Sequence, residues 1–193
     1  MDLEKKLIET LNQSQHISNE QLHEVRTASH DTAVSAILAC LDYPNLNALI
    51  AAYNVPDARY EEKLLSYSPE DMHDELHAEY WMLTLGRMQS KKAFDKIQHY
   101  VKNTNLSHMA FMSLAKIDLA RTIALFEGFL DEHCNMYDKN NVTYAHDSGF
   151  NTLLALFERY PAAKKLVKKY DFSKNEQKKQ LVQDALRYKV LGS

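Results

Sequence analysis

The sequence predicts a single all-α domain, an irregular αα-superhelix of stacked antiparallel helical hairpins. Apolar residues recur at steps of three and four along most of the chain, which is the period of an amphipathic helix. Glycine and proline occur only 4 times each, too few for the many tight turns of an all-β protein. A segment near the middle of the chain is also repeated. With 193 residues, 45% of them hydrophobic, the chain is long enough to bury one core.

The first two helices follow from apolar spacing and from a capping pattern. Apolar residues from Leu3 to Leu11 predict an opening helix over about 2–13. Ser18, with Gln21 three residues later, has the pattern of a capping box, so a second short helix is expected to begin there.

The next helices are delimited by acids and prolines. Asp31 is expected to open a helix over 31–42, and Pro44 ends it, so that the following helix begins at Leu46. Pro56 marks a further start. The run 68–71 marks another, because it has a proline at the first helical position and acids in the first turn.

The repeat relates residues 81–88 to residues 110–117 at an offset of 29. Four positions correspond in type: Leu85, Gly86, Arg87 and Met88 fall on Leu114, Ala115, Lys116 and Ile117. A third copy fits around Leu154 at an offset of 40, and a weaker copy covers 33–53. Each copy has a helix, a short polar turn and a second helix. A single hairpin cannot cover its own apolar stripe, so we expect the hairpins to stack.

This pattern, apolar-x-Leu-Gly/Ala-Arg/Lys-apolar followed by a turn and a second amphipathic helix, resembles bacterial HEAT-like repeats. The units of the array are 31–53, 76–101, 107–131 and 147–170, with a C-terminal cap helix over about 176–190. The second and third units match the pattern best. The segments 54–75 and 132–146 interrupt the array, which is why we predict an irregular one. The resemblance implies an architecture and no activity, because the shared positions are small or apolar.

Charge is distributed unevenly along the chain. Residues 1–80 contain 15 Asp and Glu against 5 Lys and Arg, whereas residues 81–193 contain 11 against 18. If the halves are successive parts of one stack, the molecule has an acidic end and a basic end.

No run of 18 apolar residues is present, so we expect no membrane partner and a cytoplasmic location. Cys40 and Cys134 lie in separate helical segments and are expected to be reduced packing thiols.

An acidic run with interleaved aromatic residues is the main candidate for partner binding. Its members are Asp57, Tyr60, Glu61, Glu62, Tyr67, Asp74, Glu75 and Glu79. Aromatic side chains supply contact area and acids steer encounter, so this run suits docking on the basic surface of another protein. The competing interpretation is that the tyrosines fill seams between helices and the acids only solubilise the surface.

A basic stripe offers a nucleic-acid alternative. Lys164, Lys165, Lys168 and Lys169 share one helix face, and helical-repeat DNA glycosylases hold duplex DNA with a basic concave face. An ordinary solvated helix face has the same pattern, and the acidic half would repel the duplex.

A metal site is the third possibility. His73 and His77 are four residues apart, with Glu70 one turn earlier, but the zinc-protease pattern needs Glu where this chain has Asp74. Acidic helix starts that contain histidine are usually solvated, so no metal and no cofactor are predicted. The chain also lacks a Gly-rich phosphate loop and a Gly-x-Ser-x-Gly elbow.

These observations favour a non-enzymatic protein-binding module over an enzyme. Within that class, the size and the acidic surface suit a bacterial immunity protein that neutralises a toxin, or an adaptor.

Overall fold

The computed structural model describes residues 2–68, 71–103, 105–133 and 144–164, with single positions further on (Leu166, Glu176, Lys179, Gln180 and Gln183). These residues form helices and loops and contain no strand, so the all-α class is confirmed for the described part. The chain divides into two compact units, Met1–His99 (unit 1) and Tyr100–Ser193 (unit 2). The single domain and the continuous superhelix stay predictions. No helix in the described ranges is long and apolar enough to cross a bilayer.

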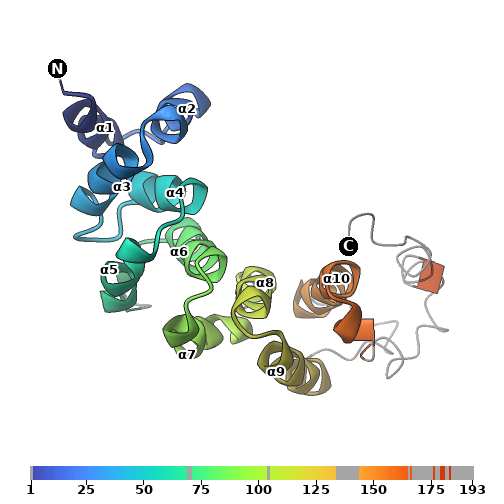
Figure 1. The fold of residues 1–193 in the computed structure, drawn as a ribbon. Coiled ribbons are helices and arrows are strands. Elements are labelled where there is room, and N and C mark those ends of the chain that lie inside the picture. Colours follow the sequence, from blue (N-terminus) through green and yellow to red (C-terminus); the bar gives the residue numbers. More distant parts are fainter. Residues whose placement is uncertain are drawn as a thin grey trace. The chain divides into compact units, whose positions relative to one another are not determined.

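Unit 1 is a two-layer arrangement of short helices. Its helices are α1 (Leu3–Leu11), α2 (Asn19–Thr27), α3 (His30–Ala39), α4 (Leu46–Asn54), α5 (Glu61–Ser66), α6 (Glu75–Arg87) and α7 (Phe94–Gln98). Figure 1 shows α1, α3 and α5 in one layer and α2, α4 and α6 in the other. Short 3-10 turns at Ala58–Tyr60 and Lys91–Ala93 lead into α5 and α7.

Helix α2 begins as predicted, whereas α3 begins at His30, one residue before the expected start at Asp31. The Ser18 hydroxyl accepts from the Gln21 N–H, and the Gln21 side chain accepts from the Ser18 N–H, which completes the capping box. For α3, the Ser29 hydroxyl accepts from the Thr32 N–H, so Ser29 is the cap and Asp31 lies in the first turn.

The predicted helix start at 68–71 lies partly outside the described residues. Asp71 is in 3-10 conformation: its N–H donates to the Ser68 carbonyl at 3.1 Å, and its carboxylate accepts from the Ser68 N–H at 2.6 Å. Helix α6 begins at Glu75, because Asp74 is extended and its side chain accepts from the His77 N–H at 3.0 Å.

Helix α6 ends in a left-handed turn at a residue that is not glycine. Gln89 has φ 56°, and the Ser90 N–H donates to the Leu85 carbonyl at 3.1 Å. This is the 6→1 bond of a Schellman motif, in which glycine normally occupies the left-handed position.

The core of unit 1 centres on aromatic and aliphatic side chains from both layers. Trp81 and Tyr60 are its largest fully buried members. The indole N–H of Trp81 donates to the Leu64 carbonyl at 2.8 Å, which ties α6 to α5. Cys40 is a buried free thiol whose pKa is raised by burial, in agreement with a packing role; Cys134 lies outside the described residues.

Unit 2 contains α8 (Ser107–Ile117), α9 (Leu119–His133) and α10 (Tyr144–Arg159), followed by a 3-10 turn at Pro161–Ala163. Phe111 lies edge-on to Phe126 and to Phe129, with ring centroids 4.8 and 5.2 Å apart, and joins α8 to α9. Between α8 and α10, His108 Nδ1 lies 3.0 Å from the Thr152 hydroxyl.

The predicted hairpin units contain pairs of helical segments. Helices α3 and α4 fall in 31–53, α6 and α7 in 76–101, and α8 and α9 in 107–131. Helix α10 begins the unit 147–170, whose last residues lie outside the described part, as does most of the predicted cap helix 176–190. The relation of these pairs as HEAT-like repeats stays a prediction.

Candidate protein-binding surface

Helices α4 and α6 lie side by side in unit 1 (Figure 1), and the contacts at their two ends show that they run in the same direction. Leu46 at the start of α4 and His77 at the start of α6 line one cleft. At the other end, the Arg87 guanidinium donates to the Tyr53 carbonyl at 2.7 Å. The two helices therefore present a shared outer face.

This outer face, which we name the α4–α6 face, is apolar for much of its length. Its members are Leu46, Ile50 and Tyr53 on α4, and Leu76, Tyr80, Leu83 and Arg87 on α6. Arg87 is exposed and the other six side chains are partly exposed. Surface helices usually present charged and polar residues to solvent, so partly exposed apolar side chains on two neighbouring helices make this face a candidate contact surface.

Two tyrosines and an arginine form a fixed cluster on this face. The Tyr53 and Tyr80 rings meet edge to face with centroids 6.0 Å apart. The Arg87 guanidinium lies 5.2 Å from the centroid of the Tyr53 ring, a cation–π distance. Together with its bond to the Tyr53 carbonyl, this contact restrains the Arg87 side chain before any partner arrives.

A polar cleft of about 320 Å³ lies at the N-terminal end of the α4–α6 face. Three chain segments line it: residues 12–16 between α1 and α2, residues 43–47 at the start of α4, and His73, Asp74 and His77 at the start of α6. Sites for small ligands span roughly 300–1,000 Å³, so the cleft has room for one amino-acid side chain or a similar group.

Buried asparagines hold the first wall of the cleft. The Asn47 amide group donates to the carbonyls of Gln13 and Gln15 at 3.2 and 2.8 Å, and its oxygen accepts from the Ile17 N–H at 2.9 Å. Asn45 donates to the Leu11 carbonyl at 3.1 Å. Because these bonds join distant parts of the chain, the loop 12–17 is held in place by α4.

The opposite wall contains a coupled aspartate and histidine. Asp74 Oδ1 lies 2.7 Å from His77 Nδ1 and also accepts from the His77 N–H. The pKa of the Asp74 carboxyl group is lowered below its ordinary value, mainly by the hydrogen bond with the His77 side chain. His77 is largely buried, whereas the Asp74 side chain is 58% exposed. The His73 ring lies edge-on to His77, with centroids 5.3 Å apart.

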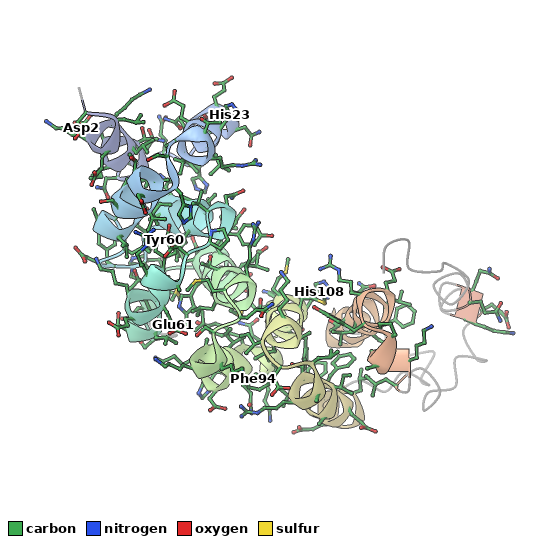
Figure 2. The ribbon with its side chains drawn as sticks, viewed as in Figure 1. Asp2, His23, Tyr60, Glu61, Phe94 and His108 are labelled. Atoms are coloured by element: carbon green, nitrogen blue, oxygen red, sulfur yellow. The ribbon has the colours of Figure 1, made fainter. Side chains whose placement is uncertain are left out.

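The structure does not gather the predicted acidic-aromatic run into one surface. Tyr60 and Tyr67 are buried, so neither can anchor a partner; Figure 2 shows Tyr60 inside the packed helices of unit 1. The Tyr67 hydroxyl donates to the carbonyls of Leu41 and Tyr43, at 2.5 and 3.1 Å. For these two tyrosines, filling of seams between helices is the correct interpretation.

Two of the predicted acids are engaged within unit 1. Asp57 accepts from the Arg59 guanidinium at 2.9 Å and lies 2.8 Å from a His30 ring nitrogen. The hydrogen bond from the Arg59 side chain lowers the pKa of the Asp57 carboxyl group more than any other contact does. Glu61 accepts from the Ser90 hydroxyl at 2.6 Å, with Lys92 at 3.6 Å. Figure 2 places Glu61 at α5.

The remaining acids differ in exposure. Glu62 and Glu75 are exposed. Glu79 is partly exposed, and burial raises the pKa of its carboxyl group. Asp74 lines the cleft together with His73 and His77, the two histidines predicted as metal candidates.

The two alternative sites fall partly outside the described residues. His73 precedes α6, so the two histidines do not lie on one helix, although their rings approach each other. Glu70 lies outside the described residues, and within them no three His, Cys, Asp or Glu side chains are placed to hold a metal ion. Lys164 is exposed, and Lys165, Lys168 and Lys169 lie outside the described part. Both alternatives stay predictions.

Sequence reasoning missed the cluster and the cleft wall. It assigned Arg87 and Tyr53 to repeat positions that specify architecture, and it gave Asn47 no role. A signal was present, because Leu46, Ile50 and Tyr53 lie on the side of α4 away from the buried Ala48 and Ala51. A helix with apolar residues on both sides is expected to contact neighbours on both sides.

No protein-family model, curated protein or solved structure matches this chain. The class of the molecule therefore follows from its fold and surface alone: an all-helical protein with an apolar outer face and a polar cleft.

Proposed function

We propose that this protein binds another protein, one with a basic surface, through the α4–α6 face of unit 1. The observation that supports this most directly is the cluster of Tyr53, Tyr80 and Arg87. Tyrosine and arginine are enriched among the residues that dominate binding energy at protein interfaces. Since these side chains are restrained in the free protein, ordering them on binding costs little entropy.

The charge of unit 1 favours a basic partner. Residues 1–99 contain 16 Asp and Glu against 9 Lys and Arg, a balance of −7. Complementary charge accelerates encounter and disfavours acidic competitors, while apolar and aromatic contacts supply most of the affinity. An immunity protein that neutralises a basic toxin, or an adaptor, would use a surface of this kind.

The test begins with affinity capture from the native host and identification of the captured protein by mass spectrometry. The purified partner is then titrated by calorimetry against the wild-type protein and single variants. Tyr80→Ala and Arg87→Ala should each raise Kd by tenfold or more, since truncating a hot-spot residue costs roughly 2 kcal/mol or more. Arg26→Ala is the matched control: Arg26 is also an exposed arginine in the last turn of its helix, but on α2.

Wild-type affinity in both α4–α6 variants would refute the proposed surface. A separate test addresses charge. Glu62→Lys reverses one exposed acid, and it should slow association at low salt, with the effect shrinking as ionic strength rises. Glu61 is unsuitable for this test because it bonds to Ser90 within unit 1.

A further inference from the structure

The polar cleft at the start of α4 and α6 has the chemistry of a site for a single cationic side chain. Asp74 presents a carboxylate whose Oδ1 lies 2.7 Å from His77 Nδ1; the side chain is 58% exposed, so a further cation can reach it. Tyr43, whose side chain is 55% exposed, lines the same cleft. Gln15 adds an amide group to the lining, whereas the amide oxygens of Asn12 and Gln13, which also line the cleft, already accept from Asn45 and Gln21.

From these features we infer that the cleft binds an arginine side chain of the partner. This inference rests on the proposed function, because the cleft continues the α4–α6 face and shares Leu46 with it. A guanidinium is planar and has five N–H donors in a fixed fork, so it can bond to a carboxylate and amide oxygens while its face lies on an aromatic ring. A lysine ammonium is compact and strongly hydrated and uses an aromatic face less well.

The surroundings disfavour an anion in this cleft. Helix N-termini attract anions through free backbone N–H groups. At α4 and α6, however, the side chains of Asn45 and Asp74 accept from the N–H groups of Ala48 and His77. The Asp74 carboxylate and the net charge of unit 1 would also repel an anion.

The cleft is built before a ligand arrives. Asn47 is 4% exposed, and both the NH₂ group and the oxygen of its side-chain amide hydrogen-bond to the loop that forms one wall. Asp74 is held by its bonds to the first turn of α6. A wall fixed in this way retains its shape in the free protein, so binding one side chain requires little reorganisation.

The experiment titrates the full chain, labelled with ¹⁵N, with arginine blocked at both ends (N-acetyl-arginine methylamide). Amide shifts should change at residues 12–16, 43–47 and 73–77, with a Kd on the order of 1 mM. Blocked lysine should bind more weakly. Blocked citrulline, which has the shape of arginine without its charge, should bind at least about tenfold more weakly.

Two variants separate charge from fold. Asp74→Asn keeps a good helix cap while it removes the charge, and it should raise Kd for blocked arginine about tenfold. Asp31→Asn is the matched control; it removes an equally charged carboxylate, 90% exposed, on α3, and should leave Kd within about twofold. Tyr43→Ala should raise Kd by roughly three- to fivefold through loss of the ring, and the Tyr43 backbone contacts stay in place.

Equal binding of citrulline and arginine, shifts produced by phosphate in place of arginine, or an unaffected Kd in Asp74→Asn would each overturn the inference. Failure of arginine to bind, while Tyr80→Ala and Arg87→Ala still weaken partner binding, would remove the arginine site and leave the proposed function standing. If arginine binds but neither Tyr80→Ala nor Arg87→Ala weakens partner binding, the arginine site stands and the proposed function is refuted.

Discussion

Replacing Asn47 with alanine removes the three hydrogen bonds that connect the first turn of α4 to the loop between α1 and α2. The bonds join Asn47 to the Gln13 and Gln15 carbonyls and to the Ile17 N–H, at 3.2, 2.8 and 2.9 Å. They span 30 to 34 residues of sequence, so no local helical contact can replace them.

The expected cost is about 2–3 kcal/mol in the free energy of unfolding. Each bond contributes roughly 0.5–1.5 kcal/mol net of exchange with water, and three of them give a total of about 2–4 kcal/mol. The freed groups of the loop are only part-buried, so water can reach them, which favours the lower half of that range.

The measurement is a urea titration followed by tryptophan fluorescence. Trp81 is the only tryptophan of the chain and is fully buried in unit 1, so its emission reports the unfolding of the unit that contains Asn47. Asn54→Ala is the matched control, because it makes the same chemical change on the same helix. Asn54 donates only to the Ile50 carbonyl one turn away, and its loss should cost less than about 1 kcal/mol.

Equal destabilisation by the two variants would refute the reasoning, since it would mean that the long-range bonds of Asn47 contribute no more than a local one. A loosened loop should also weaken binding of blocked arginine in Asn47→Ala. Asn54→Ala should bind the probe as the wild type does.

Three further predictions concern stability. Tyr67→Phe should cost about 1–2 kcal/mol because its hydroxyl donates to two carbonyls, whereas Tyr60→Phe should be neutral or stabilising, since no bond to its buried hydroxyl occurs among the described residues; urea titrations compare them. Burial, and to a smaller extent the charge of Arg159, lowers the pKa of His108 in the folded protein, so the unfolded chain binds a proton at this histidine at higher pH than the folded chain does. The stability of unit 2 should therefore fall as pH drops below about 6.5, the ordinary pKa of histidine. Unfolding followed by circular dichroism should show a smaller loss of stability in His108→Gln. Gln89→Gly should leave stability unchanged or raise it by up to about 1 kcal/mol in thermal melts, because φ is 56° there.

Several features of the fold could be predicted from the sequence because they depend on neighbours three or four residues apart. The capping box at Ser18 and Gln21 is one, and the apolar stripes that define α1 and α4 are others. The first residue of a helix is harder to predict where two residues that can cap it lie close together. Ser29 rather than Asp31 caps α3, because the Ser29 hydroxyl accepts from the Thr32 N–H while Asp31 lies in the first turn.

What the sequence by itself determined is the helical class, the placement of most helices and the acidic balance of the N-terminal half, all of which follow from residue type and short-range spacing. Only the tertiary structure decided which polar and aromatic residues face solvent. Tyr60 and Tyr67 share a pattern with exposed tyrosines, but both are buried: the turn that holds Tyr60 packs on α3 and α5, and the Tyr67 hydroxyl reaches the carbonyls of Leu41 and Tyr43. Tyr53 meets Tyr80 and Arg87, and Asn47 meets the loop 12–17, across about thirty residues, and such pairings depend on how whole helices pack.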